Sequence, residues 1–261
     1  MASDLTGESA ETVEPVETPH RFRFLTVYSI LGLALGVAAA ALAVGLTTIV
    51  RGSPLWSTWR PSGGGLGAAN QIAEHVGGEY RLPNGTQLDD VIAKAPSVSA
   101  NGVTIKVGYV AVRGSHGAVD QVYPVDGSNS VMYTLCGLGD SCSIASGKAS
   151  VARGRVVRRE ILELALYTFH YVNGAQSVIA IVPPRTPSVS TTIVYLRRTD
   201  LHPELGPPLA RTLSPRAPQP ATMSPREAQL VDETTTSRSY NFSLTRAQDG
   251  NTILVLSPLS A

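Results

Sequence analysis

The sequence predicts an α+β protein with one N-terminal transmembrane helix, followed by an extracytoplasmic domain of mostly antiparallel strands with one long helix. Three observations support this prediction. The 26-residue run Leu25–Val50 carries no charge. Several short apolar or alternating segments, separated by Gly, Pro and Asn, are typical of strands. One segment, residues 151–172, has the apolar repeat of a long amphipathic helix.

Residues 1–22 form a predicted disordered tail. Acidic residues recur along this segment, Arg21 is its only basic residue, and large apolar side chains are nearly absent before Phe22. Such a segment buries too little apolar surface to offset the entropy of ordering the chain. We therefore expect an acidic tail on the cytoplasmic side.

Residues 23–50 form the predicted transmembrane helix. The uncharged run would make about 39 Å of helix, more than the roughly 30 Å of a hydrocarbon core. A cleaved signal peptide would have a shorter apolar core behind a basic start, whereas the tail here is acidic. The lipid bilayer is therefore the first expected partner.

Small residues recur at every fourth position within this run, at Gly32, Gly36 and Ala40. This spacing lets two helices approach closely, so it predicts a homodimer contact through the span. The alternative is that Gly and Ala are simply frequent in this sequence.

The orientation of the span rests on the cysteines. Arginines are equally frequent on its two sides, with Arg21 and Arg23 before it and Arg51 and Arg60 after it, so the positive-inside rule does not decide. The only two cysteines lie six residues apart in a Gly-rich segment, a pattern easiest to explain outside the cytosol. We expect a plasma-membrane protein with a cytoplasmic N-terminus and an external C-terminal domain.

Cys136 and Cys142 are predicted to form a structural disulfide that closes a seven-residue loop. Free thiols, a metal site and a redox pair are the alternatives. A metal site would need two further ligands, and the histidines show no paired spacing; a redox pair would more often be C-x-x-C. No metal or cofactor is expected.

The remaining chain divides into an interfacial collar and Gly linker at 51–66 and an α+β domain at 67–261. Trp and Arg in the collar suit the headgroup layer. In chain order, the domain's expected elements are a helix over 69–76 stopped by Gly77–Gly78, a hairpin turning at Asn84–Gly85, strands at 103–112 and 130–136, the long helix 151–172, strands at 177–184 and 191–198, a proline-rich segment at 203–225, a short helix capped by Ser224, and a hairpin turning at Asp249–Gly250.

The long helix is expected to bury one apolar face and to expose the opposite one. Arg155, Arg159 and Glu163 fall on that opposite face. Arg159 and Glu163 are one turn apart, which predicts an ion pair between them.

Two stretches carry a resemblance, "CGLGDSC" at 136–142 and "RREILELALYTFHYV" at 158–172. They resemble stretches of uncharacterised single-pass membrane proteins of high-GC Gram-positive bacteria, and the likeness covers most of the region after the span. The resemblance implies an anchor and an outer domain. It brings no activity, so no functional residue is transferred.

The net charge and the absence of known motifs exclude some classes of function. A net charge of +1 with scattered arginines argues against nucleic acid, and no catalytic motif is found. We expect a non-catalytic interaction domain that contacts another envelope protein. The alternatives are a hydrolase-type envelope enzyme, with a site around His116, Asp120 and His170, and a ligand-sensing domain that signals through the span.

Overall fold

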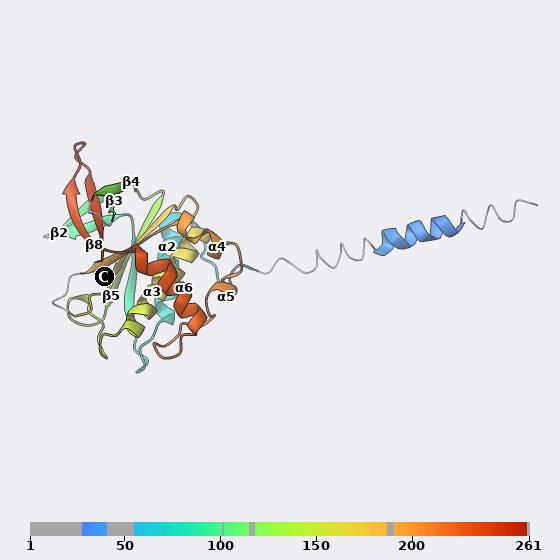
Figure 1. Cartoon of the computed structure of the whole chain (residues 1–261), viewed down its shortest axis with the longest axis horizontal. Helices are drawn as coiled ribbons and strands as arrows, with labels where there is room; N and C mark the ends of the chain where they lie inside the picture. Colours follow the sequence, from blue (N-terminus) through green and yellow to red (C-terminus); the bar gives the residue numbers. More distant parts are fainter. Residues whose placement is uncertain (1–27, 41–54, 101, 115–117, 187–190, 260–261) are drawn as a thin grey trace, which may run out of the picture. The chain divides into compact units, whose positions relative to one another are not determined.

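The computed structural model describes residues 28–40, 55–100, 102–114, 118–186 and 191–259. The chain divides into two compact units, Met1–Pro54 and Leu55–Ala261, and each is described by itself. The second unit is an α+β domain that combines one large mixed sheet with a layer of helices (Figure 1). The predicted α+β class is therefore confirmed.

In the first unit, residues 28–40 form a helix in which every residue is exposed. Gly32, Gly36 and Ala40 lie in this helix at the predicted four-residue spacing. The tail 1–22 and the rest of the predicted span lie outside the described residues. Within the described part of the chain, no helix combines the length and the apolar character needed to cross a bilayer.

The described residues of the second unit form nine strands and a set of helices. The strands are β1 (Asp89–Lys94), β2 (Ser97–Ala100), β3 (Val103–Arg113), β4 (Val119–Pro124), β5 (Ser130–Gly137), β6 (Ser177–Val182), β7 (Thr192–Arg197), β8 (Ser239–Arg246) and β9 (Thr252–Pro258). The α-helices are α2 (Gly65–Glu79), α3 (Val151–Tyr171), α4 (His202–Leu205), α5 (Leu209–Thr212) and α6 (Pro225–Thr235). Short 3-10 turns are η1 (Asp140–Cys142), η2 (Arg198–Leu201) and η3 (Thr236–Arg238).

The strand order is β1-β5-β6-β7-β8-β9-β3-β2, and β4 pairs with β3 beside this path. Six of the pairings are antiparallel, and β5–β6 and β3–β9 are parallel. The β5–β6 pairing needs a crossover, and α3 supplies it. The domain is thus mostly antiparallel, with one β-α-β unit in its centre.

The main core lies between the sheet and the helices. Helix α3 packs against α2, α6 and strands β6 and β7, and it buries most of its residues. On the sheet side, alternate residues of β6 such as Val178 and Ala180 belong to this core. Burial of this apolar surface holds the helices on the sheet.

A second core lies on the opposite face of the same strands. Met132 of β5, Ile179 of β6 and Ile193 of β7 pack there with Leu254 and Leu256 of β9. Because successive strand residues point to opposite faces, β6 serves both cores. The strands at the β3 end of the sheet form the other wall of this core.

Several predicted local signals are present. The Ser150 side chain, which the sequence analysis did not single out, accepts a hydrogen bond from the Arg153 backbone N–H at the start of α3. The Ser224 side chain caps α6 in the same way, as predicted. The β8–β9 turn has φ +84° at Gly250, which suits the glycine predicted there.

Other elements differ from the prediction. Helix α2 starts at Gly65 and runs through the expected stop at Gly77–Gly78 to Glu79. Gly77 instead allows close packing on β1, because a Cβ there would meet Val91 Cγ2 at 2.8 Å. The expected hairpin at Asn84–Gly85 is only an isolated bridge, and β1 pairs with β5 instead.

Candidate functional site

The predicted disulfide between Cys136 and Cys142 is present. Cys136 lies near the end of β5, and Cys142 ends η1, with their Cα atoms 4.5 Å apart. Glycine is required inside this loop, because a Cβ at Gly137 would lie 2.3 Å from the Ser143 carbonyl oxygen. Closing a loop of this length contributes roughly 2 kcal/mol by restricting the unfolded chain. The bond holds η1 against the end of strand β5, ahead of helix α3.

Of the three residues expected in a hydrolase-type site, Asp120 and His170 are described, and they lie on separate elements. His116 lies outside the described residues. Asp120 is exposed on β4, which pairs with β3. His170 lies in the last turn of α3, in the helical layer, where its ring contacts Trp56 and Tyr171.

A network of charged side chains joins α3 to α6. Arg159 is completely buried, so the prediction that it lies on an exposed face of the helix is wrong. Its guanidinium contacts Glu227 of α6 (Nε–Oε1, 2.9 Å) and Glu163 (Nη1–Oε2, 2.5 Å). The Tyr80 hydroxyl accepts from the same guanidinium and donates to Glu163 at 2.8 Å. The predicted Arg159–Glu163 ion pair is therefore confirmed, but in the interior.

Glu227 is held at the other end of this network by Ser214. The Ser214 hydroxyl donates to Oε2 at 2.6 Å and its backbone N–H to Oε1 at 3.0 Å, while the Ser214 carbonyl accepts from Arg159 at 2.7 Å. Burial alone would raise the pKa of Glu227, but the hydrogen bonds from Ser214 and Arg159 outweigh it and lower that pKa. Tyr80, Arg159, Glu163, Ser214 and Glu227 are called the Arg159 network below.

Asp89 and Glu160 form a second buried group. Both side chains have no exposed surface, and no other described residue donates to either carboxyl. Burial raises the pKa of Asp89 to about 7, and burial, followed by the charge of Asp89, raises that of Glu160 well above its usual value. Raised pKa values favour the protonated, uncharged form of a buried carboxyl group. The two residues are called the acid pair.

A cluster of aromatic side chains holds residues 55–62 against the helices. These residues are called the strap below. The Trp56 ring stacks on His170 at 4.1 Å between centroids, and the Trp59 ring stacks on His75 at 4.0 Å. Both indoles also meet the edge of Tyr167. The two tryptophans are partly buried on the main core, whereas the sequence suggested the headgroup layer.

Hydrogen bonds extend the contact of the strap. The Trp56 carbonyl accepts from the Leu209 N–H of α5 at 2.7 Å, and the hydroxyls of Ser57 and Tyr171 lie 2.6 Å apart. The backbone N–H and carbonyl of Ser62 both bond the Gln71 side chain in α2. The strap is therefore part of the folded domain, and α2 follows it after Gly63 and Gly64.

The surroundings of the two stacked histidines favour their uncharged forms. Burial lowers the pKa of His75, against the opposite effect of Glu79 and Glu163. Burial and then the charge of Arg198 both lower the pKa of His170. Neutral imidazole rings stack on the flat indole faces without leaving a charge at a partly buried contact.

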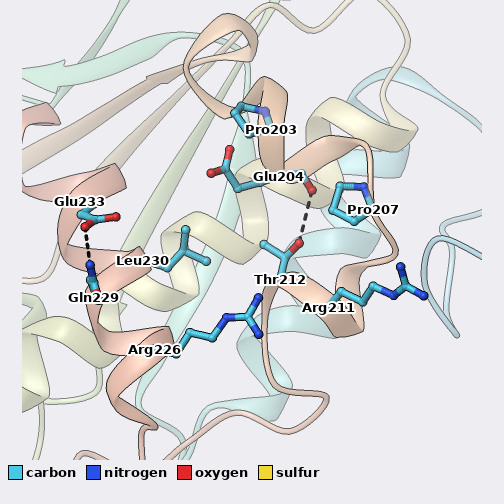
Figure 2. A pocket seen from close by; sticks show the side chains of 9 residues that line it. All are labelled: Pro203, Glu204, Pro207, Arg211, Thr212, Arg226, Gln229, Leu230 and Glu233. Atoms are coloured by element: carbon cyan, nitrogen blue, oxygen red, sulfur yellow. Dashed lines mark hydrogen bonds between the residues drawn. The ribbon is translucent and has the colours of Figure 1, made fainter.

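Two open hollows lie on the surface. The larger, about 320 Å³, is formed by α4, α5 and α6, with Arg226 and Leu230 extending toward Thr212 and Arg211 extending away (Figure 2). Its charged residues are two arginines and two glutamates, so no ligand charge is favoured. The smaller, about 240 Å³, is lined by residues of β4, β7 and β8, including Arg197 and Tyr240. Neither is lined by the Arg159 network or by the acid pair.

No group of three or more metal-ligating side chains occurs among the residues that the structure describes. No protein-family model, curated protein or solved structure matches the chain. The resemblance to single-pass membrane proteins of high-GC Gram-positive bacteria therefore remains a prediction.

Two of these features were missed by the sequence analysis. The acid pair joins positions 89 and 160, and no local pattern links residues so far apart. The strap could have been suspected, because two tryptophans in a short segment supply more apolar surface than a free linker needs.

Proposed function

We propose that this chain is a single-pass membrane-anchored envelope protein whose α+β domain lies outside the cytosol and serves as a non-catalytic interaction module. The observation that carries the proposal is the Cys136–Cys142 disulfide, which lies in the domain that follows the uncharged run. Disulfides persist in oxidising compartments and are rare in the cytosol. With a single span, an external domain implies a cytoplasmic N-terminus.

The anchor is supported by the uncharged run. Leu25–Val50 exceeds the length required to cross a hydrocarbon core, and a helix satisfies its own backbone hydrogen bonds in lipid. Gly32, Gly36 and Ala40 would bring two such helices together, so a homodimer through the span is part of the proposal.

The interaction role is supported by an open strand. β4 pairs with β3 along one edge, and no other described strand pairs with it. Val119 and Val122 of β4 are 50% and 53% exposed. An exposed apolar edge strand presents unpaired backbone groups to which a partner strand can add. The proposed partner is an envelope protein that extends the sheet at β4.

The interior polar groups support a structural role over a catalytic one. The Arg159 network satisfies its charges within the protein, and both it and the acid pair lie away from the two described hollows. A catalytic group must reach its substrate. Their chemistry therefore serves the packing of the domain.

The side of the membrane is tested by alkylating intact cells with a membrane-impermeant maleimide, with and without prior impermeant reductant. We expect labelling of Cys136 and Cys142 only after reduction. Labelling that requires cell lysis would place the domain inside and overturn the proposal.

The partner is tested by affinity purification from mild detergent after cross-linking. We expect a co-purifying protein with the wild type and its loss with Val122→Arg in β4. Val151→Arg is the matched control, because Val151 is 75% exposed at the start of α3, away from β4. A wild-type protein recovered alone and monodisperse, or a partner retained by Val122→Arg, would contradict the interaction role.

A further inference from the structure

Strand β1, which carries one member of the acid pair, lies at the edge of the sheet and is held by few contacts. It pairs with β5 along one side, and no other described strand pairs with it. Its buried side chains are Asp89, Val91 and Ala93. Val and Ala bury little apolar surface, so such a segment belongs to the part of a domain that opens most readily. The state of Asp89 therefore has a large influence on whether β1 stays in place.

Asp89 connects β1 to helix α3 through Glu160. The two carboxyl groups are in direct contact, and both side chains are completely buried. No other described residue donates a hydrogen bond to them. Two carboxylates in this position would repel each other without water or a donor to offset their charge. The contact between β1 and α3 is therefore favourable only while the pair holds protons.

The charged groups around the acid pair do not neutralise it when it ionises. Arg159 favours the ionised form of Glu160, but its guanidinium already pairs with Glu163 and Glu227. The charges of Glu163 on α3 and of Asp90 on β1 act against ionisation of the pair. Each proton that leaves therefore adds a buried negative charge without a counter-charge of its own.

Other titratable groups on the surrounding elements act differently. Burial raises the pKa of Tyr80, which follows α2, and that of Tyr133 on β5, so both hydroxyls stay protonated. Burial lowers the pKa of His75 on α2, and the hydrogen bonds described above lower that of Glu227 on α6 despite its burial. Lowered pKa values stabilise the folded state as the pH rises, whereas raised carboxyl pKa values destabilise it. A loss of stability at β1 on raising the pH therefore points to the acid pair.

We propose that the acid pair is a pH-sensitive latch for β1. While the pair holds its protons, β1 stays paired with β5; when the protons leave, β1 separates locally and the rest of the domain stays folded. The open form leaves β5 as the edge strand, with unpaired backbone groups. This inference does not depend on the membrane anchor or on a partner at β4.

The latch is tested on the full chain in mild detergent by hydrogen–deuterium exchange from pH 5 to pH 8, with each rate divided by the intrinsic rate at that pH. The amides of β1 report local opening, and those of the central strand β7 report unfolding of the whole domain. A carboxyl that is protonated in the closed form and ionised in the open form changes the opening equilibrium about tenfold per pH unit. We expect β1 to open more readily than β7 at every pH, and its opening equilibrium to increase by about this factor for each unit from pH 5 to pH 7.

Matched variants identify the groups responsible. Asp89→Asn combined with Glu160→Gln replaces both carboxyls by uncharged amides, so the pH dependence at β1 should disappear. Asp120→Asn removes an exposed carboxyl on β4 and should leave the pH dependence unchanged. If the double variant does not fold, the pH series of the wild type decides the proposal.

Two results on the wild type would overturn the latch. If the β1 amides are as strongly protected as those of β7, β1 opens only when the whole domain unfolds. If β1 opens more readily than β7 but equally at pH 5 and pH 7, the acid pair does not control the opening. A pH dependence that persists in the double variant would also overturn the proposal, because other groups would then be responsible.

Discussion

The two faces of the central strands β5, β6 and β7 bury different chemistry. The helix-covered face contains Arg159, Glu227 and the acid pair among its apolar side chains. The buried residues of the opposite face carry no charge, and their polar groups are hydroxyls such as those of Ser130 and Ser177, which lie 2.8 Å apart. An apolar core gains free energy from any well-packed arrangement, but a buried charge is tolerated only where its partner is present. The buried charges therefore require one particular position of the helices, whereas the apolar side chains of the second core can pack in more than one way.

The largest effect is expected when the Arg159 network loses its cation. Arg159→Met keeps the volume but leaves Glu163 and Glu227 buried without a counter-charge, so we expect a loss of about 3–5 kcal/mol in the free energy of unfolding. Arg155→Met, one turn earlier and partly exposed in an ion pair with Asp232, is the matched control and should cost less than about 1 kcal/mol. Urea denaturation measures both. Equal stability of the two variants would show that the network does not specify the helix layer.

The second prediction concerns how the free energy of unfolding depends on pH through the acid pair. The acid pair should make the protein less stable as the pH rises, whereas salt-bridged carboxylates make it less stable as the pH falls. The folded-state pKa of Asp89 is about 7, above its usual 3.8, so the folded protein binds more protons than the unfolded chain between these values. This contribution is complete at low pH and is lost as the pH rises toward 7. One pKa unit corresponds to about 1.4 kcal/mol, and we expect a decline on the order of 2–4 kcal/mol over this range.

Asp89→Asn should make this decline shallower and leave the part that Glu160 contributes in the same direction. Asp120→Asn, which removes an exposed carboxyl on β4, should leave the decline unchanged. Denaturation curves collected from pH 4 to pH 7 provide the measurement. Glu227 and Asp232 act in the opposite direction, because their pKa values are lowered in the folded state and their contribution is lost as the pH falls. A slope in Asp89→Asn as steep as that of the wild type would contradict the acid pair.

A smaller and pH-independent effect is expected in the second core. Ile179→Val removes one buried methylene from the face of β6 opposite the helices, and we expect a loss of about 1 kcal/mol. The loss should be the same at pH 4 and pH 7, because no carboxyl group lies in this core. A loss that changes with pH would show that the two faces are coupled.

The smallest effect is expected at the rim of the helix layer. Asp232 of α6 pairs with Arg155 and Arg158 but remains about one-third exposed. Asp232→Asn should therefore cost less than about 1 kcal/mol, less still at high salt, because solvent screens exposed pairs. Thermal unfolding at low and high salt checks this value. If Asp232→Asn lowered the free energy of unfolding as much as Arg159→Met, buried and partly exposed charges would not differ in their effect on stability.

The sequence by itself determined the local elements and their chemistry. The long helix 151–172, the Ser224 cap, the Asp249–Gly250 turn and the Cys136–Cys142 disulfide all follow from short patterns, because turns, caps and one-turn contacts depend on residues close in sequence. The α+β class follows from the same patterns.

Only the tertiary structure decided which distant segments meet. The parallel β3–β9 pairing, the burial of Arg159 under α6 and the contact between Asp89 and Glu160 join residues far apart in the chain. The strap on His75 and His170 belongs to the same class. A residue's periodicity shows which way it faces along its own helix or strand, but the element that covers it is set by the packing of the whole chain.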